Sequence, residues 1–155
     1  MKPRALVIGL GQPAAGDDAV GIAVVVRLRA EGALDGVTLE TVSDATGLVE
    51  RLQAGVPVIV VDAVVGGGSV GDVLVLAPER LDGDARPLST HGMSVAQAIA
   101  LARALAPNSV SSMIRIVGVV IDPPKQGEIA LSSPIADAVA KAAATVHALL
   151  REVMN

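Results

Sequence analysis

The chain has 155 residues, a formal net charge of −4 and a composition that is 52 % hydrophobic, without cysteine, phenylalanine, tyrosine or tryptophan. The lack of cysteine excludes disulfides, thiolate metal sites and cysteine nucleophiles, and scattered basic residues without aromatic stacking platforms argue against nucleic acid as a partner. No apolar stretch reaches the roughly 18–20 residues of a membrane helix and the N-terminus has no signal-peptide pattern, so we expect no membrane association and one cytoplasmic α/β domain over residues 1–155.

The first half of the chain alternates between apolar strands and helices. RALVIGL (4–10) predicts a buried strand, and DDAVGIAVVVRLRAEG (17–32) predicts a helix whose acidic start suits the helix dipole. VTLETVS (37–43) alternates as a half-buried strand does, and TGLVERLQAG (46–55) predicts a short helix. VPVIVVDAV (56–64) is the clearest buried strand, and its valine-rich run is typical of parallel strands covered on both faces.

The second half of the chain continues this alternation. The sequence predicts Ser133 as the cap of the last helix and Pro134 in the first turn of that helix. The whole pattern predicts right-handed crossovers and a mostly parallel sheet with helices on both faces. We expect a glycine-rich turn over 64–72 and then a strand over 73–77 that is antiparallel or at an edge. A loop over 78–92, a helix over 93–107 and a strand over 112–121 follow. The last two predicted elements are a loop over 122–133 and a helix over 134–154.

Polar residues follow the ends of most of the predicted strands. In open α/β sheets, binding sites lie at the carboxyl ends of the strands. We therefore expect several carboxylates and one of the two histidines to converge on one rim of the sheet. The candidates are Asp17, Asp18, Asp44, Thr46, Asp62, His91 and Asp122.

Asp62 carries the most information among these residues, because it ends an apolar run where a carboxylate needs a partner or a cation to offset desolvation. Two carboxylates and one imidazole, from Asp18, Asp62 and His91, would form a site suited to nickel, zinc, manganese or iron with open positions. The plainer alternatives are that Asp62 caps a turn and that His91 is a polar residue at a helix start.

The other candidates have local alternatives too. Asp17 either takes part in the site or serves the helix dipole, and Asp44 and Thr46 either line a substrate groove or cap a turn. His147, in the middle of the last predicted helix, is expected to be a partly buried packing residue.

The stretch GLGQPAAGDDAVG (9–21) also has a nucleotide-binding interpretation, with Gly9, Gly11 and Ala14 in the positions of a G-x-G-x-x-A clamp. Pro13 removes an amide hydrogen that a pyrophosphate could use. The acidic pair that follows would repel phosphate from the helix amides. The stretch therefore favours a cation over a phosphate, and a small nucleotide-binding module stays as the alternative function.

Five segments in order resemble the nickel–iron hydrogenase maturation endopeptidases: VIGLGQPAAGDDAVG, DATGLVERL, VIVVDAVVGGGSVGDV, STHGMSVAQAIALA and IRIVGVVIDPPKQGEIALSSPIADAV. The resemblance spans nearly the whole chain. It implies a three-layer α/β/α sandwich around a twisted, mostly parallel five-stranded sheet with one antiparallel edge strand. It also implies an endopeptidase that removes a C-terminal peptide from the immature hydrogenase large subunit after nickel insertion.

The resemblance further implies that Asp18, Asp62 and His91 contact the nickel carried by the substrate, and that another divalent metal such as zinc or cadmium can occupy the site. Gln12, Ala14 and Ala15 depart from the family's usual loop, where Asn stands in place of the glutamine and larger residues follow the proline.

No nucleophile motif is present: G-x-S-x-G and H-E-x-x-H are both absent. An attacking water is then the simplest choice, with Asp18 or Asp62 as general base and a metal that polarises the carbonyl or the water. A relative that binds metal or a partner without cutting is a third possibility.

Overall fold

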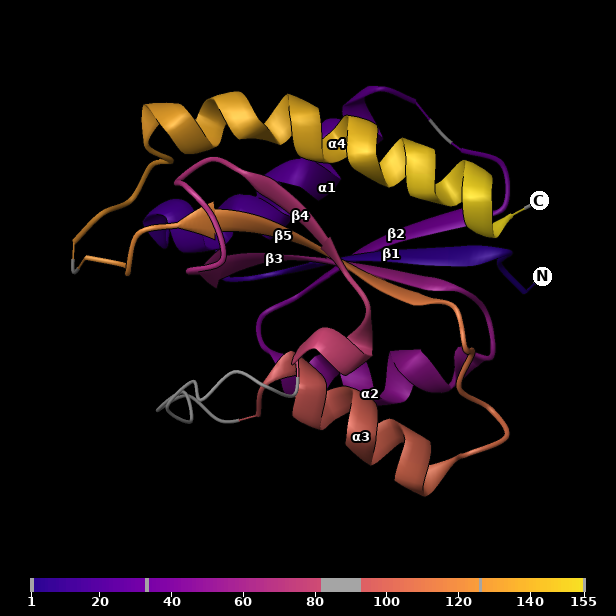
Figure 1. Cartoon of the computed structure of the whole chain (residues 1–155). Coiled ribbons are helices and arrows are strands. Elements are labelled where there is room, and N and C mark those ends of the chain that lie inside the picture. The colour runs from indigo at the N-terminus through magenta and orange to yellow at the C-terminus, as the bar shows by residue number, and fades with distance from the viewer. Residues whose placement is uncertain (1, 33, 82–92, 126, 155) are drawn as a thin grey trace.

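The computed structural model describes residues 2–32, 34–81, 93–125 and 127–154. Within them, five strands form one sheet in the order β2-β1-β3-β5-β4 (Figure 1). Four strands are parallel and β4 runs antiparallel to β5 at one edge, which confirms the predicted mostly parallel sheet. The strands are β1 (Ala5–Leu10), β2 (Val37–Val42), β3 (Val58–Val65), β4 (Val73–Leu76) and β5 (Ile114–Ile121).

Helices cover both faces of the sheet, so the predicted three-layer sandwich is also confirmed. In Figure 1, α1 and α4 lie over one face and α2 and α3 over the other. The α-helices are α1 (Val20–Ala30), α2 (Leu48–Arg51), α3 (Val95–Leu105) and α4 (Ser133–Val153). The short 3₁₀ helices are η1 (Gly16–Ala19), η2 (Ala45–Gly47), η3 (Leu52–Ala54) and η4 (Pro78–Leu81).

The boundaries of the predicted helices differ from the structure at several points. The helix expected over 17–32 begins instead as η1, and α1 starts only at Val20. The helix expected over 46–55 is a chain of η2, α2 and η3. The cap position of α4 is Ser132 and not Ser133, and the Ser132 side chain makes no hydrogen bond within that helix. No helix in the described ranges is long and apolar enough to cross a membrane.

The two faces of the sheet divide the core by residue parity, because successive side chains of a strand point to opposite faces. Val7 and Val61 belong to the core under α1 and α4, whereas Ile8 and Val60 belong to the core shared with α2 and α3. The alternation continues along β3, so Asp62 is directed toward the face that α2 and α3 cover.

A side-chain hydrogen bond joins the end of α1 to α4. Glu31, which follows α1, accepts a hydrogen bond from Nε2 of His147 in α4 at 3.2 Å, and the His147 side chain is partly buried, as expected. The hydrogen bond from His147, together with the Arg27 guanidinium, lowers the pKa of Glu31.

This lowered pKa predicts an acid-dependent contribution to stability. Because the folded-state pKa of Glu31 lies below its unfolded value of 4.5, the contribution is present above that value and is lost as the pH falls through the lowered pKa. We expect the wild type to melt at a higher temperature than Glu31→Gln at pH 6 and the difference between the two Tm values to shrink as the pH falls below 4.5. A Tm difference that stays constant over this range would contradict the assignment.

Candidate functional site

The direction of strand order reverses between β1 and β3. The chain leaves β1 toward β2 on one side, and β3 lies on the other side. Ligands of open α/β sheets bind outside the carboxyl ends of the strands at this kind of reversal. The segment that carries Asp18 follows β1. Asp62 lies inside β3 and not at its end as expected, one residue past Val61, where the pairing of β3 with β1 stops.

Two glycines allow the start of α1 to lie close against β1 and β3. A Cβ atom on Gly21 would lie 2.4 Å from the carbonyl oxygen of Val61 and 2.5 Å from that of Leu10. A Cβ atom on Gly9 would lie 2.3 Å from the carbonyl oxygen of Gly21. Because no other residue allows this approach, the helix start is fixed over β1 and β3, and η1 with Asp18 lies against β3.

The loop before η1 folds back on itself. Gly11 and Gly16 have φ of 143° and 63°, a region that favours glycine, and a Cβ atom on Gly11 would lie 2.6 Å from the carbonyl oxygen of Asp18. Ala14 also has a positive φ of 59°, which is unfavourable by about 1–2 kcal/mol for a residue with a Cβ. The loop is thus held in one tight conformation, and that conformation sets the position of Asp18.

Asp62 is half-buried on β3, and its Oδ1 accepts a hydrogen bond from the backbone N–H of Ala63 at 2.8 Å. The next strand places Gly118 directly beside it in the register. Gly118 has no side chain, and a Cβ atom there would lie 3.1 Å from both methyl groups of Val64, so this glycine lets Val64 pack against β5. Sequence reasoning missed this role of Gly118, although a glycine inside a strand pattern is a known sign of close approach by another group.

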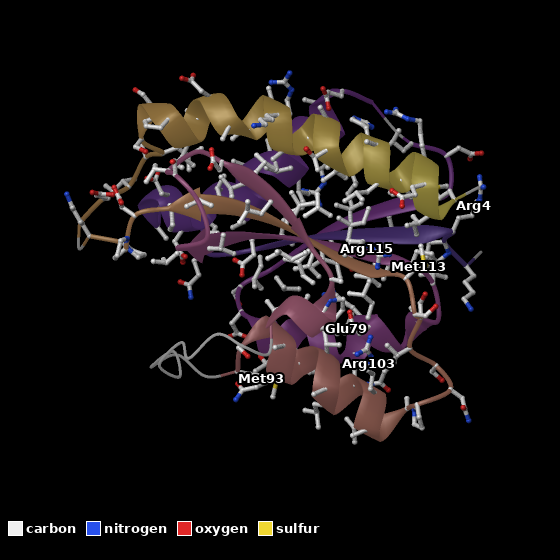
Figure 2. The ribbon with its side chains drawn as sticks, in the orientation of Figure 1. Arg4, Glu79, Met93, Arg103, Met113 and Arg115 are labelled. Atoms are coloured by element: carbon white, nitrogen blue, oxygen red, sulfur yellow. The ribbon has the colours of Figure 1, made fainter. Side chains whose placement is uncertain are left out.

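The third predicted ligand, His91, lies outside the described residues. The helix that follows it begins with a capping box, in which Ser94 Oγ accepts from the N–H of Gln97 and the Gln97 side chain accepts from the N–H of Ser94. Met93 lies just before the first residue of α3. Figure 2 shows it on one side of the molecule, whereas Arg4 and Met113, which precede β1 and β5, lie on the other side. The start of α3 therefore lies at the same end of the sheet as Asp62. The described residues on their own contain no group of three His, Cys, Asp or Glu side chains that could hold a metal ion.

Asp17 lies in the first turn of η1, where its charge suits the helix dipole as considered, and its side chain also has a distant partner. Its two carboxylate oxygens accept from the N–H of Ser132 at 2.7 Å and from the Ser132 hydroxyl at 2.8 Å, and the N–H of Gly16 donates to the carbonyl oxygen of Ile129. Asp17 therefore ties the loop after β1 to the loop before α4.

We expect Asp17→Ala to lower the free energy of unfolding by about 1–2 kcal/mol, because both hydrogen bonds involve a charged acceptor on a partly exposed loop. Urea unfolding of Asp17→Ala, Ser132→Ala and the double variant measures the coupling between the two residues. Strictly additive effects of the two substitutions would show that the pair contributes nothing.

Asp44 and Thr46 lie after β2 and interact mainly with each other. Asp44 Oδ1 accepts from the N–H of Thr46 at 2.9 Å and from the Thr46 hydroxyl, so Asp44 caps η2. These hydrogen bonds from Thr46, the side-chain bond first, lower the pKa of Asp44. Both residues are exposed. Within the chain, their side chains cap a turn, which is the plainer of the two alternatives considered for them.

A small polar cavity of ≈ 220 Å³ lies beside the loop that carries Asp18. Asp122, which follows β5, lies in its wall. The remaining lining residues come from η1, the turn before β4, the segment between β5 and α4, and the first turn of α4: Asp17, Val70, Pro123, Pro124, Lys125, Glu128, Ser132 and Pro134.

The geometry of the opening loop disfavours a nucleotide. A dinucleotide clamp leads directly into a helix whose N-terminal amides receive the phosphates. Here η1 stands between the loop and α1, and it presents Asp17 and Asp18 at that place. The glycines serve helix–strand contact and tight turns, and the carboxylates favour a positively charged partner.

Comparison with known proteins gives a consistent result. The family model described as hydrogenase maturation protease matches residues 7–149. The chain is similar in structure to the hydrogenase maturating endopeptidase HybD from E. coli, with a TM-score of 0.77, 22% identity and coverage of 96% of this chain and 93% of that one. It is also similar to the [NiFe] hydrogenase maturation protease HycI from Thermococcus kodakarensis KOD1, with a TM-score of 0.72, 24% identity and coverage of 96% and 92%. No curated protein sequence matches the chain.

Proposed function

The chain belongs to the hydrogenase maturation protease family, and from that premise we propose that it removes the C-terminal extension of a nickel–iron hydrogenase large subunit after nickel insertion. Family membership makes the chain a protease. The site supports the finer proposal because η1, which carries Asp18, lies against the strand that carries Asp62.

The nickel in this proposal belongs to the substrate. Asp18 and Asp62 would contact it through carboxylate oxygens and His91 through an imidazole nitrogen, a mixed donor set that suits a borderline divalent ion such as nickel, and also zinc or cadmium. The acidic loop also matches a cation better than an anion. A precursor without nickel would lack this contact, so the protease would distinguish loaded from unloaded precursors.

Hydrolysis would use a water molecule, because the chain has no cysteine. One of the two carboxylates would accept a proton from that water as its oxygen attacks the scissile carbonyl carbon. The C–N bond then breaks, and the released amine takes up the proton. We therefore propose an aspartic-type endopeptidase in which the other carboxylate and His91 orient the metal-bearing end of the substrate.

Incubation of the pure chain with nickel-loaded and nickel-free large-subunit precursors tests this function. We expect intact-mass spectrometry to show loss of a C-terminal peptide from the loaded precursor alone. Thermal-shift measurements with nickel, zinc, cadmium, NAD and ATP accompany it. Metal binding without cleavage of any precursor would favour a non-catalytic relative, and a response to nucleotide alone would favour the nucleotide-binding alternative.

A further inference from the structure

Strand β3 extends past the end of its neighbour β1. Pairing between β1 and β3 ends at Gly9 and Val61, whereas pairing between β3 and β5 continues to Val65 and Ile121. Residues 62–65 are therefore held extended by β5 on one side. On the β1 side, no strand in the described part of the chain pairs with them.

The hydrogen-bonding pattern shows which backbone groups face this open edge. The N–H of Leu6 in β1 donates to the carbonyl oxygen of Pro57, and the N–H of Val58 donates to Met113 before β5. Odd-numbered residues of β3 thus face β1 and even-numbered residues face β5. Past Val61, the groups on the open side belong to Ala63 and Val65.

The backbone groups of Ala63 and Val65 differ in whether they already have a hydrogen-bond partner. The N–H of Ala63 donates to Asp62 Oδ1. The carbonyl oxygen of Ala63 and the N–H and carbonyl oxygen of Val65 have no hydrogen bond to the described backbone outside the regular strands. Val65 is 46% exposed, and a Cβ atom on the following Gly66 would meet nothing within 4 Å. Within the described part of the chain, the surroundings of Val65 and Gly66 are therefore open.

A rigid strand edge with unpaired backbone groups is a template for an extended peptide. We propose that the C-terminal extension of the hydrogenase precursor binds here as an added strand, hydrogen-bonded to the carbonyl oxygen of Ala63 and the N–H of Val65. This inference rests on the proposed function. It commits to the substrate peptide as occupant because the edge is continuous with Asp62, so a strand laid along it passes directly by that carboxylate.

Strand addition also explains how a small site can hold a protein segment. Main-chain hydrogen bonds provide binding that does not depend on the peptide sequence, and they keep the peptide extended as a protease requires. Nickel contact at Asp18 and Asp62 would then supply selectivity, and the edge of β3 would supply alignment of the scissile bond.

Val65→Pro tests the proposal. Proline removes the N–H that faces the open edge. The pairing of β3 with β5 stays intact, because the backbone N–H and carbonyl groups of Val65 face away from β5. Val75→Pro is the matched control. Val75 is 48% exposed on β4, the edge strand of the sheet. The N–H of Val120 in β5 donates to the carbonyl oxygen of Asp72, so in this antiparallel register the even-numbered residues of β4 bond to β5. The N–H of Val75 therefore points away from β5. Val65→Ala keeps the N–H and controls for the side chain.

We expect Val65→Pro to lower kcat/KM for the nickel-loaded precursor by about tenfold or more, mainly through KM, because a backbone hydrogen bond is lost and the ring obstructs the added strand. Val75→Pro and Val65→Ala should cleave within about twofold of wild type. Equal rates for Val65→Pro and wild type would overturn strand addition and leave the proposed function standing. Absence of cleavage by the wild type would overturn both.

A second measurement does not depend on the folding of a variant. On adding a synthetic peptide of the precursor's C-terminal extension to the wild type, we expect slower hydrogen exchange at the Val65 amide and unchanged exchange at the Val75 amide. No change at Val65 would contradict the proposal. Protection of Val65 that rises with protein concentration without peptide would assign the edge to a second copy of the chain instead, and would also contradict it.

Discussion

Asp62→Asn is expected to lower kcat/KM for the nickel-loaded precursor by about 10²–10⁴-fold, the range for loss of a positioned acid–base group. Asparagine has nearly the same shape and retains an oxygen that can accept the hydrogen bond from Ala63 N–H, so the strand should be preserved. It loses the negative charge, and with it the ability to accept a proton or to bind a cation strongly. The loss should therefore appear in activity and not in folding.

Asp18→Asn and His91→Gln complete this experiment at the other two predicted positions. Asp35→Asn is the matched control, because Asp35 is an exposed carboxylate in the segment before β2, at the amino end of the sheet. Cleavage rates and Tm values of all four variants are compared with the wild type. If Asp62→Asn and Asp18→Asn both cleave at the wild-type rate, the assignment of the site is wrong.

The strands could be placed from the sequence because their pattern has a single physical cause. β3 and β5 are buried on both faces, so they consist of nearly unbroken runs of Val and Ile that few other structures accommodate. The alternation of strands and helices then restricts the topology to right-handed crossovers. This order brings Asp18 and Asp62 to the same end of the sheet, as predicted from strand ends alone.

The contacts between distant segments could not be predicted in this way. The partner of Asp17 is Ser132, 115 residues away in the chain, whereas local reasoning considers only the helix dipole next to the carboxylate. The short length of β1 relative to β3, which creates the open edge at Val65, is likewise visible only in the register. The position of His91 stays a prediction.

The glycines of the opening stretch have a role that the sequence indicated only weakly. Gly9 could equally belong to a phosphate clamp, and Gly21 lowers helix propensity by about 1 kcal/mol relative to alanine. In the structure both allow α1 to contact β1 and β3. Close helix–strand contact is also found in phosphate-binding loops, so the feature that distinguishes this loop is η1, which places Asp17 and Asp18 before α1.

Gly21→Ala is expected to lower the free energy of unfolding by about 3 kcal/mol, the upper part of the range for overpacking a close contact. Gly21 lies inside α1 and does not have a positive φ, so helix propensity alone predicts the opposite sign, a gain of about 1 kcal/mol. The new Cβ would meet two backbone oxygens, of Val61 at 2.4 Å and of Leu10 at 2.5 Å, and neither strand can move without disturbing the sheet. The start of α1 must then shift outward and carry η1 and Asp18 with it.

Urea unfolding measures this effect, with Ala144→Gly on the exposed side of α4 as a reference for helix propensity in the same chain. We expect Ala144→Gly to lower the free energy of unfolding by about 1 kcal/mol and to leave cleavage unchanged, whereas Gly21→Ala should lower both stability and cleavage. Stabilisation by Gly21→Ala would show that α1 can move away from the strands at little cost. The position of Asp18 would then not be fixed by the helix–strand contact, and the site would need another support for its geometry.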